Sequence, residues 1–265
     1  MKRYLILILP LAALLLWALP QSSDNEVKLG IAAYKNNHYD EAIQHFEKAV
    51  ELDPGNVTAQ LYAATACVSQ YIPGVGSEEN VAFADRAVAH YQRVLDANAT
   101  REQKLNSAKG IAYIDLNMKK WDEAKTYYQM ASSIDPKDAE SYYSMGVIDW
   151  TQCYSFRMEG RAKLGMAPDQ HLSSKKPAQQ KFCEEVQVKN MSLVEDGITN
   201  LEKAIELRAE YDDAMAYMNL MYRERADMEC DDLGARQRDL KTADDWVDKA
   251  LATKKAKAER NTISQ

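Results

Sequence analysis

The sequence predicts an all-α protein built from antiparallel helix pairs, and three observations support this fold. The stretch YDEAIQHFEKAVELDPGN at 39–56 recurs in nearly the same form as WDEAKTYYQMASSIDPKD at 121–138. Alanine, leucine, glutamate and lysine are abundant, and the 265 residues include only seven prolines and ten glycines, a balance that favours helices. Apolar residues recur every three or four positions, as on one face of a helix. Such a recurrence indicates a repeat architecture.

The first unit, at about 23–56, is expected to be a helical hairpin. Gly30 in its first helix and Ala42 in its second are small, so the two helices can approach closely. The sequence NNH at 36–38 forms the turn between them. Asp53 ends the second helix, because the proline that follows disfavours helical geometry at that residue. A further unit at about 105–138 repeats the arrangement with Ala112 in the place of Gly30.

These units resemble the tetratricopeptide repeat, a 34-residue helix–turn–helix. The match is carried in the first unit by Leu29, Gly30, Tyr39, Ala42, Phe46, Ala49 and Pro54, and in the other by Ile111, Ala112, Trp121, Ala124, Tyr128, Ala131 and Pro136. Ala33 stands where the family has an aromatic residue, with Tyr34 next to it. The resemblance implies a right-handed α-solenoid over 23–265.

The remaining units depart further from the pattern. The second, at 57–100, contains the inserted loop IPGVGSEEN. The fourth, at 139–210, is interrupted by an insertion at 152–190. The fifth covers about 211–255, and its last helix is expected to cap the array with a polar outer face, as terminal repeats require.

Residues 1–22 precede the repeats and are interpreted as a signal peptide or an N-terminal anchor. Lys2 and Arg3 are followed by an uninterrupted apolar run at 4–19, the pattern of a secretory signal. The run is short for a membrane span. The sequence therefore predicts an exported protein that is periplasmic or otherwise extracytoplasmic, with membrane contact only through this segment if it stays uncleaved.

The net charge and the absence of catalytic motifs argue against nucleic-acid binding and against catalysis. The net charge of −7 argues against a nucleic-acid partner, which usually requires a basic footprint. None of the four histidines has the spacing of a known catalytic or metal motif, so the sequence predicts a non-enzymatic protein without cofactor or metal. The insertion is locally basic and is expected to steer an acidic partner. Its cations are Arg157, Arg161, Lys163, Lys175, Lys176, Lys181 and Lys189.

The resemblance implies that the first helices of successive units line a concave groove, which binds a protein or peptide partner. The groove positions carried over by register are Val27, Ile31, Tyr34, Leu61, Thr65, Val68, Lys109, Tyr113, Leu116, Tyr143, Val147 and Trp150. Many are large and apolar, which suits an apolar peptide, although each could instead pack against a neighbouring helix. The alternative is a periplasmic small-ligand binder in which 152–190 closes the groove as a lid.

The four cysteines form no CxxC pair. The turn-like sequence GMAPDQHLSSKKP predicts that the insertion folds back as two short helices around a loop. This fold-back would bring Cys153 and Cys183 together, and we hypothesise a disulfide between them, as an oxidising compartment would permit. The alternative is a set of thiols buried as small apolar side chains.

Overall fold

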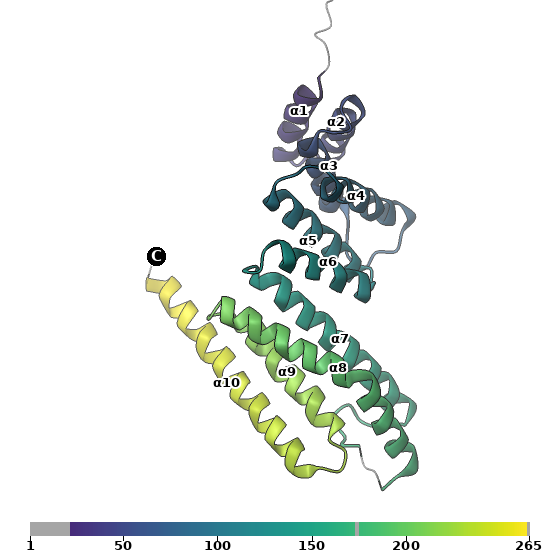
Figure 1. Cartoon of the computed structure of the whole chain (residues 1–265), viewed down its shortest axis with the longest axis vertical. Coiled ribbons are helices and arrows are strands. Elements are labelled where there is room, and N and C mark those ends of the chain that lie inside the picture. Colours follow the sequence, from purple (N-terminus) through teal and green to yellow (C-terminus); the bar gives the residue numbers. More distant parts are fainter. Residues whose placement is uncertain (1–21, 173–174, 264–265) are drawn as a thin grey trace, which may run out of the picture.

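The structure is a computed structural model that describes residues 22–172 and 175–263. These residues form ten helices and no strand (Figure 1). The helices are α1 (Ser23–Lys35), α2 (Tyr39–Leu52), α3 (Val57–Gln70), α4 (Glu78–Asp96), α5 (Arg101–Asn117), α6 (Trp121–Ile134), α7 (Ala139–Lys163), α8 (Pro177–Leu207), α9 (Asp212–Met228) and α10 (Leu233–Ile263). Each helix packs against the next one in the chain. The expected all-α solenoid of helix pairs is confirmed.

Local sequence signals set where the helices begin and turn. The side chains of Asn56 and Thr100 accept hydrogen bonds from the free backbone N–H groups at the starts of α3 and α5. Gln103 completes a capping box with Thr100. Asn37 and Lys119 occupy the same place in the turns after α1 and α5, and both have a positive φ, 62° and 60°. The two units that share the sequence pattern thus also share the backbone conformation of the turn between their helices.

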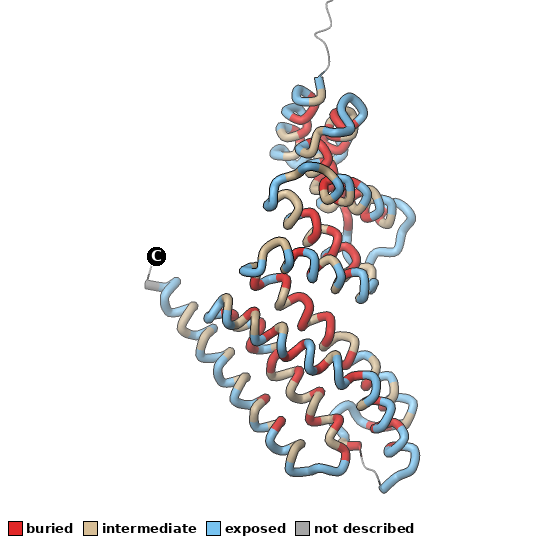
Figure 2. Tube along the Cα trace, viewed as in Figure 1, coloured by how far each residue is buried: buried red, intermediate tan, exposed pale blue. Residues whose placement is uncertain are grey.

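Close approach between the two helices of a pair depends on the small residues that the sequence singled out. A Cβ added to Gly30 would lie 2.5 Å from Phe46 Cε1, so the Phe46 ring fills the space above the glycine. Ala112 and Tyr128 are buried together in the third pair. Buried residues follow the inner faces of successive pairs along the array (Figure 2). Most of these residues form four clusters, each of which includes residues of more than one pair, so neighbouring pairs bury one another's apolar faces.

The insertion in the fourth unit does not form two short helices. Residue 152 lies inside α7, which continues to Lys163, and residue 190 lies inside α8, which begins at Pro177. The two helices pack against each other as one extended pair and project beyond the shorter pairs α1 to α6 (Figure 1). The chain does fold back between Lys163 and Pro177, as expected, but between continuations of α7 and α8 and not between two separate short helices. The segment therefore lengthens the fourth unit instead of covering the first helices as a lid.

Two of the expected surface cations of the insertion are buried. Arg157 forms a two-point ion pair with Glu224 of α9, with N–O distances of 2.7 and 2.8 Å, and also lies 3.2 Å from Asp227. Arg161 pairs with Asp227 and donates to the Pro168 carbonyl oxygen. Their charges are thus compensated inside the protein, and only the five lysines of the predicted basic patch remain at the surface.

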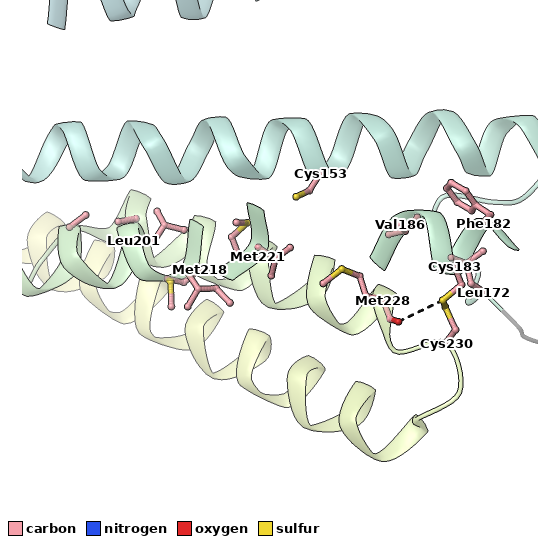
Figure 3. Packing of buried hydrophobic residues seen from close by; sticks show 14 of the residues in the cluster. Cys153, Leu172, Phe182, Cys183, Val186, Leu201, Met218, Met221, Met228 and Cys230 are labelled. Atoms are coloured by element: carbon pink, nitrogen blue, oxygen red, sulfur yellow. Dashed lines mark hydrogen bonds between the residues drawn. A yellow bond between two sulfur atoms is a disulfide. The ribbon is translucent and has the colours of Figure 1, made fainter. Parts of the chain in front are cut away.

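The extended helices enclose a separate core. Figure 3 shows Cys153 of α7 pointing into a core to which Val186 and Leu201 of α8 and the methionines Met218 and Met221 of α9 also belong. Methionine adapts its shape to irregular gaps, which suits helices of unequal length. The last helix, α10, packs on α9 and exposes most of its charged side chains, as a terminal cap requires, whereas Asp239 is buried and pairs with Arg225 of α9.

The disulfide joins Cys183 to Cys230 and not to Cys153. Because α7 and α8 run straight past each other, Cys153 lies against Asn190, whose side-chain amide donates to the Cys153 carbonyl oxygen at 3.1 Å. Asn190 is about 10 Å along α8 from Cys183 at 1.5 Å per residue. The hypothesised Cys153–Cys183 bond is therefore wrong, and Cys153 and Cys67 are buried free thiols.

Residues 1–21 of the expected signal peptide or anchor lie outside the described residues. Among the described helices, none combines the length and the apolar character that a bilayer crossing requires.

Candidate functional site

The candidate site is the row of first helices, α1, α3, α5, α7 and α9. Within this row α1 contacts α3, and α7 contacts α9. The predicted groove residues lie on four of these helices. Their burial and contacts decide which of them a ligand could reach.

At the N-terminal end of the row, the predicted groove residue Val27 does not line the groove. Val27 is only 7% exposed and packs between Ala49 and Ala59 in the interface of the first two units. It is a core residue, because this turn of α1 faces the second unit. Ile31, on the next turn, is half-buried and also touches this cluster.

The remaining predictions on α1 and α3 are partly exposed. The Tyr34 hydroxyl lies 2.8 Å from the Ser69 hydroxyl, which links α1 to α3. Thr65 donates to the backbone carbonyl oxygen of its own helix at Leu61. Val68, Leu61 and Tyr34 pack at the border of the core formed by the first two units. This part of the row offers small polar and aliphatic groups together with the Tyr34 phenol.

In the third unit the groove positions differ in chemistry. Lys109 of α5 reaches the start of α7, where its ammonium lies 3.1 Å from Asp138 and 2.5 Å from Glu140. Burial opposes the charge on Lys109, but these hydrogen bonds outweigh burial and raise its pKa. Tyr113 is 41% exposed, whereas Leu116 packs against the core. Tyr113 is therefore the accessible aromatic group of this unit.

The fourth and fifth units together form a chain of aromatic side chains across α7 and α9. The Tyr143 ring lies 4.9 Å from that of Tyr211 and 5.7 Å from that of Tyr217, centroid to centroid. Trp150 lies 5.4 Å from Tyr217 and stacks on Tyr154 at 5.0 Å. We call these five residues the aromatic chain. Val147 lies one turn from Tyr143 and is half-buried.

Arginine side chains stand at both ends of the aromatic chain. The Arg208 guanidinium lies over the Tyr211 ring at 4.2 Å, and that of Arg157 lies 5.4 Å from the Tyr154 ring. Burial is the main cause that raises the pKa of Tyr211 to about 12 and also raises the pKa of Tyr143 and Tyr217. These phenols therefore stay neutral at physiological pH and act as apolar surfaces with one hydrogen-bonding tip.

Sequence reasoning placed Tyr143 and Trp150 on this surface but missed Tyr154, Tyr211 and Tyr217. Tyr154 could have been found, because it lies four residues after Trp150 on the same helix face. Tyr211 and Tyr217 depend on how the fifth unit stacks on the fourth, which the divergent fifth unit did not reveal. The site carries binding chemistry. Within the described residues no group of three or more His, Cys, Asp or Glu side chains is placed to hold a metal ion.

Comparison with known proteins agrees with this architecture. Residues 27–56 match the Tetratricopeptide repeat family. No curated protein matches the chain in sequence. Together with the helix pairs, the family match confirms the resemblance to tetratricopeptide-repeat proteins that the 34-residue pattern suggested.

Three solved structures have a similar fold. A crystal structure of MamA protein is 15% identical with a TM-score of 0.58, covering 89% of this chain and 94% of that one. MamA from Desulfovibrio magneticus RS-1 is 14% identical with a TM-score of 0.55, covering 88% and 96%. YrrB, described as a TPR protein with an unusual peptide-binding site, is 14% identical with a TM-score of 0.53, covering 88% and 92%. At these identities the likeness concerns the fold.

Proposed function

We propose that the chain is an exported, non-enzymatic scaffold that binds a protein or peptide partner along its first helices. The contact centre is the aromatic chain on α7 and α9. The observation that carries this proposal is the packing of the Tyr143, Trp150, Tyr154 and Tyr217 rings on α7 and α9. Tyr211, just before α9, is only 7% exposed and supports the Tyr143 ring from the core. Large rigid aromatic groups dominate the binding energy of protein interfaces.

The environment of the aromatic chain favours a particular kind of peptide. Tyr143, Tyr217 and Trp150 are partly buried, so they present fixed ring surfaces at little entropic cost. Arg208 and Arg157 lie against the outer rings. We infer a segment with apolar or aromatic residues in its middle, either extended or helical.

Two features support export. The N-terminal residues combine Lys2 and Arg3 with the apolar run at 4–19, as in a secretory signal. The Cys183–Cys230 disulfide is the second, because structural disulfides persist in oxidising compartments. A reporter fused after Gln265 should be active outside the cytoplasm, and activity confined to the cytoplasm would refute export.

The binding proposal is tested by affinity capture from the native host with Trp150→Ala as the informative variant. We expect captured partners to be lost or strongly reduced, because truncation of an aromatic anchor typically costs about 2 kcal/mol or more. Trp246→Ala is the matched control, since Trp246 lies in α10 outside the first helices. Circular dichroism verifies that both variants are folded. Equal capture by both variants would refute this contact centre.

A further inference from the structure

The extended pair of α7 and α8 presents an apolar surface that includes none of the five residues of the aromatic chain. Val188 is 87% exposed, the largest exposure among the large hydrophobic residues described. Beside it, two adjoining clefts of about 290 and 470 Å³ share Phe156 and Lys181 in their walls, and Phe182 lines the smaller one. A hollowed apolar surface rimmed by polar groups is typical of a protein interaction site.

The charges around these clefts cancel. Three lysines and three glutamates line them, namely Lys163, Lys181, Lys189, Glu159, Glu184 and Glu185. A strongly acidic or basic partner would meet as many like charges as opposite ones. A surface that meets a copy of itself must instead carry both signs, because a single sign would repel its own copy.

The order of charges along α8 fits a second copy that runs antiparallel. When two antiparallel helices cross at the same residue, positions equidistant from the crossing lie opposite each other. Lys181 is seven residues before Val188, and Glu195 is seven residues after it. Both are exposed and lie on the helix face that carries Val188, because seven residues make nearly two turns. In a dimer that crosses at Val188, Lys181 of each copy would therefore lie opposite Glu195 of the other copy.

We propose that this face binds a second copy of the chain and forms a two-fold dimer in which the two α8 helices cross antiparallel at Val188. The apolar contact is made by Val188 with the cleft residues beside it. The two Lys181–Glu195 pairs set the orientation. This surface is formed by α8 and the part of α7 from Phe156 onwards, and no residue of the aromatic chain lines it, so the dimer does not rest on the proposed binding function.

Sedimentation equilibrium of residues 22–265 over a range of concentrations tests the dimer. The wild type is expected to shift from monomer to dimer as concentration rises, and Val188→Glu is expected to stay monomeric at every concentration. Leu251→Glu is the matched control, since Leu251 is also an exposed apolar residue but lies on α10, and it should dimerise like the wild type. A monomeric wild type would overturn the proposal, as would a dimer that survives Val188→Glu.

The orientation is tested by exchanging the two charges. Lys181→Glu and Glu195→Lys should each weaken the dimer by about tenfold, because each places like charges opposite each other twice. The double variant Lys181→Glu/Glu195→Lys should recover the wild-type dissociation constant. If the double variant is as weak as the single ones, the antiparallel register is refuted. Lys181 and Glu195 are both exposed, and circular dichroism should show unchanged helix content in all three variants.

Discussion

Cys183, near the start of α8, is bonded to Cys230, which lies between α9 and α10. Two further contacts fasten the same end of the bundle. Gln187 donates to the Met228 carbonyl oxygen at 2.7 Å, and a ring nitrogen of His171 lies 3.2 Å from the Cys230 carbonyl oxygen. The covalent bond thus joins the extension of the fourth unit to the connection within the fifth.

We expect the Cys183→Ser/Cys230→Ser variant to be less stable than the oxidised wild type. The bond closes a loop across a sequence separation of 47, and constraining the unfolded chain to that extent is worth about 4 kcal/mol. Urea unfolding followed by circular dichroism measures the difference. Urea unfolding in the presence of a reducing agent is the control. Reduction should lower the stability of the wild type and leave the stability of the variant unchanged.

Thiol reactivity gives a separate check on the same bond. Burial raises the pKa of Cys67 to about 11 and that of Cys153 to about 12, so neither forms the reactive thiolate in the folded protein at neutral pH. Unreduced protein should show two thiols after denaturation and almost none before. Four thiols in denatured material from the native compartment would contradict the disulfide.

The sequence alone predicts the repeat architecture well, because the units at 23–56 and 105–138 each carry the full pattern within their own residues. Gly30 and Phe46 stand in the positions that a close helix pair requires, and the structure brings them together. The disulfide was beyond such reasoning. It depends on the register in which the two antiparallel helices pair after the chain reverses at GMAPDQHLSSKKP, and the sequence of this loop does not set that register. A continuous α8 places Asn190 at Cys153 and leaves Cys183 to Cys230.

The candidate site was predictable only in part for a similar reason. Tyr143 and Trp150 follow from the register within their own unit. Val27 occupies an equivalent register position but is buried by the second unit, and Tyr217 joins the aromatic chain only through the stacking of α9 on α7. Contacts between units depend on their relative rotation, which a pattern within one unit does not encode.

The buried ion pair between Arg157 and Glu224 should be far more important for stability than a surface pair. Arg157→Met leaves the Glu224 carboxylate buried without its two-point partner, which typically costs about 3–5 kcal/mol. Arg260→Met is the control, because the Arg260–Glu210 pair is half exposed and such pairs contribute about 0–1 kcal/mol. Urea unfolding compares the two. Similar losses in both variants would show that the Glu224 carboxylate is not isolated from water.

The contact between Gly30 and Phe46 predicts that Gly30→Ala destabilises the protein despite the better helix propensity of alanine. Forcing a methyl group into a packed core costs about 1–3 kcal/mol, whereas the propensity gain is about 1 kcal/mol. Gly234→Ala is the control, because at this exposed position the added Cβ meets only the side chains of Asp232 and Arg238. Thermal unfolding should show a lower Tm for Gly30→Ala and an unchanged or higher Tm for Gly234→Ala.

Asp149 should make stability fall as pH rises through the mildly acidic range. Its carboxylate on α7 is fully buried, 2.7 Å from the Lys125 ammonium of α6. Burial raises the pKa of Asp149 to about 6, although Lys125 acts in the opposite direction. In the unfolded chain the pKa of an aspartate is about 3.9. Between these two values the folded protein holds a proton that the unfolded chain has released, so raising the pH favours unfolding.

Asp149→Asn removes this titration and isolates its effect. Lys125 stays protonated throughout the range, because its pKa is raised above an already high value. The free energy of unfolding of the wild type minus that of Asp149→Asn should therefore decrease by up to about 3 kcal/mol between about pH 4 and pH 6 and stay constant above. Urea unfolding of both proteins at each pH measures this difference. A difference that rises with pH would mean that the ion pair with Lys125 outweighs burial and holds the folded-state pKa below 3.9.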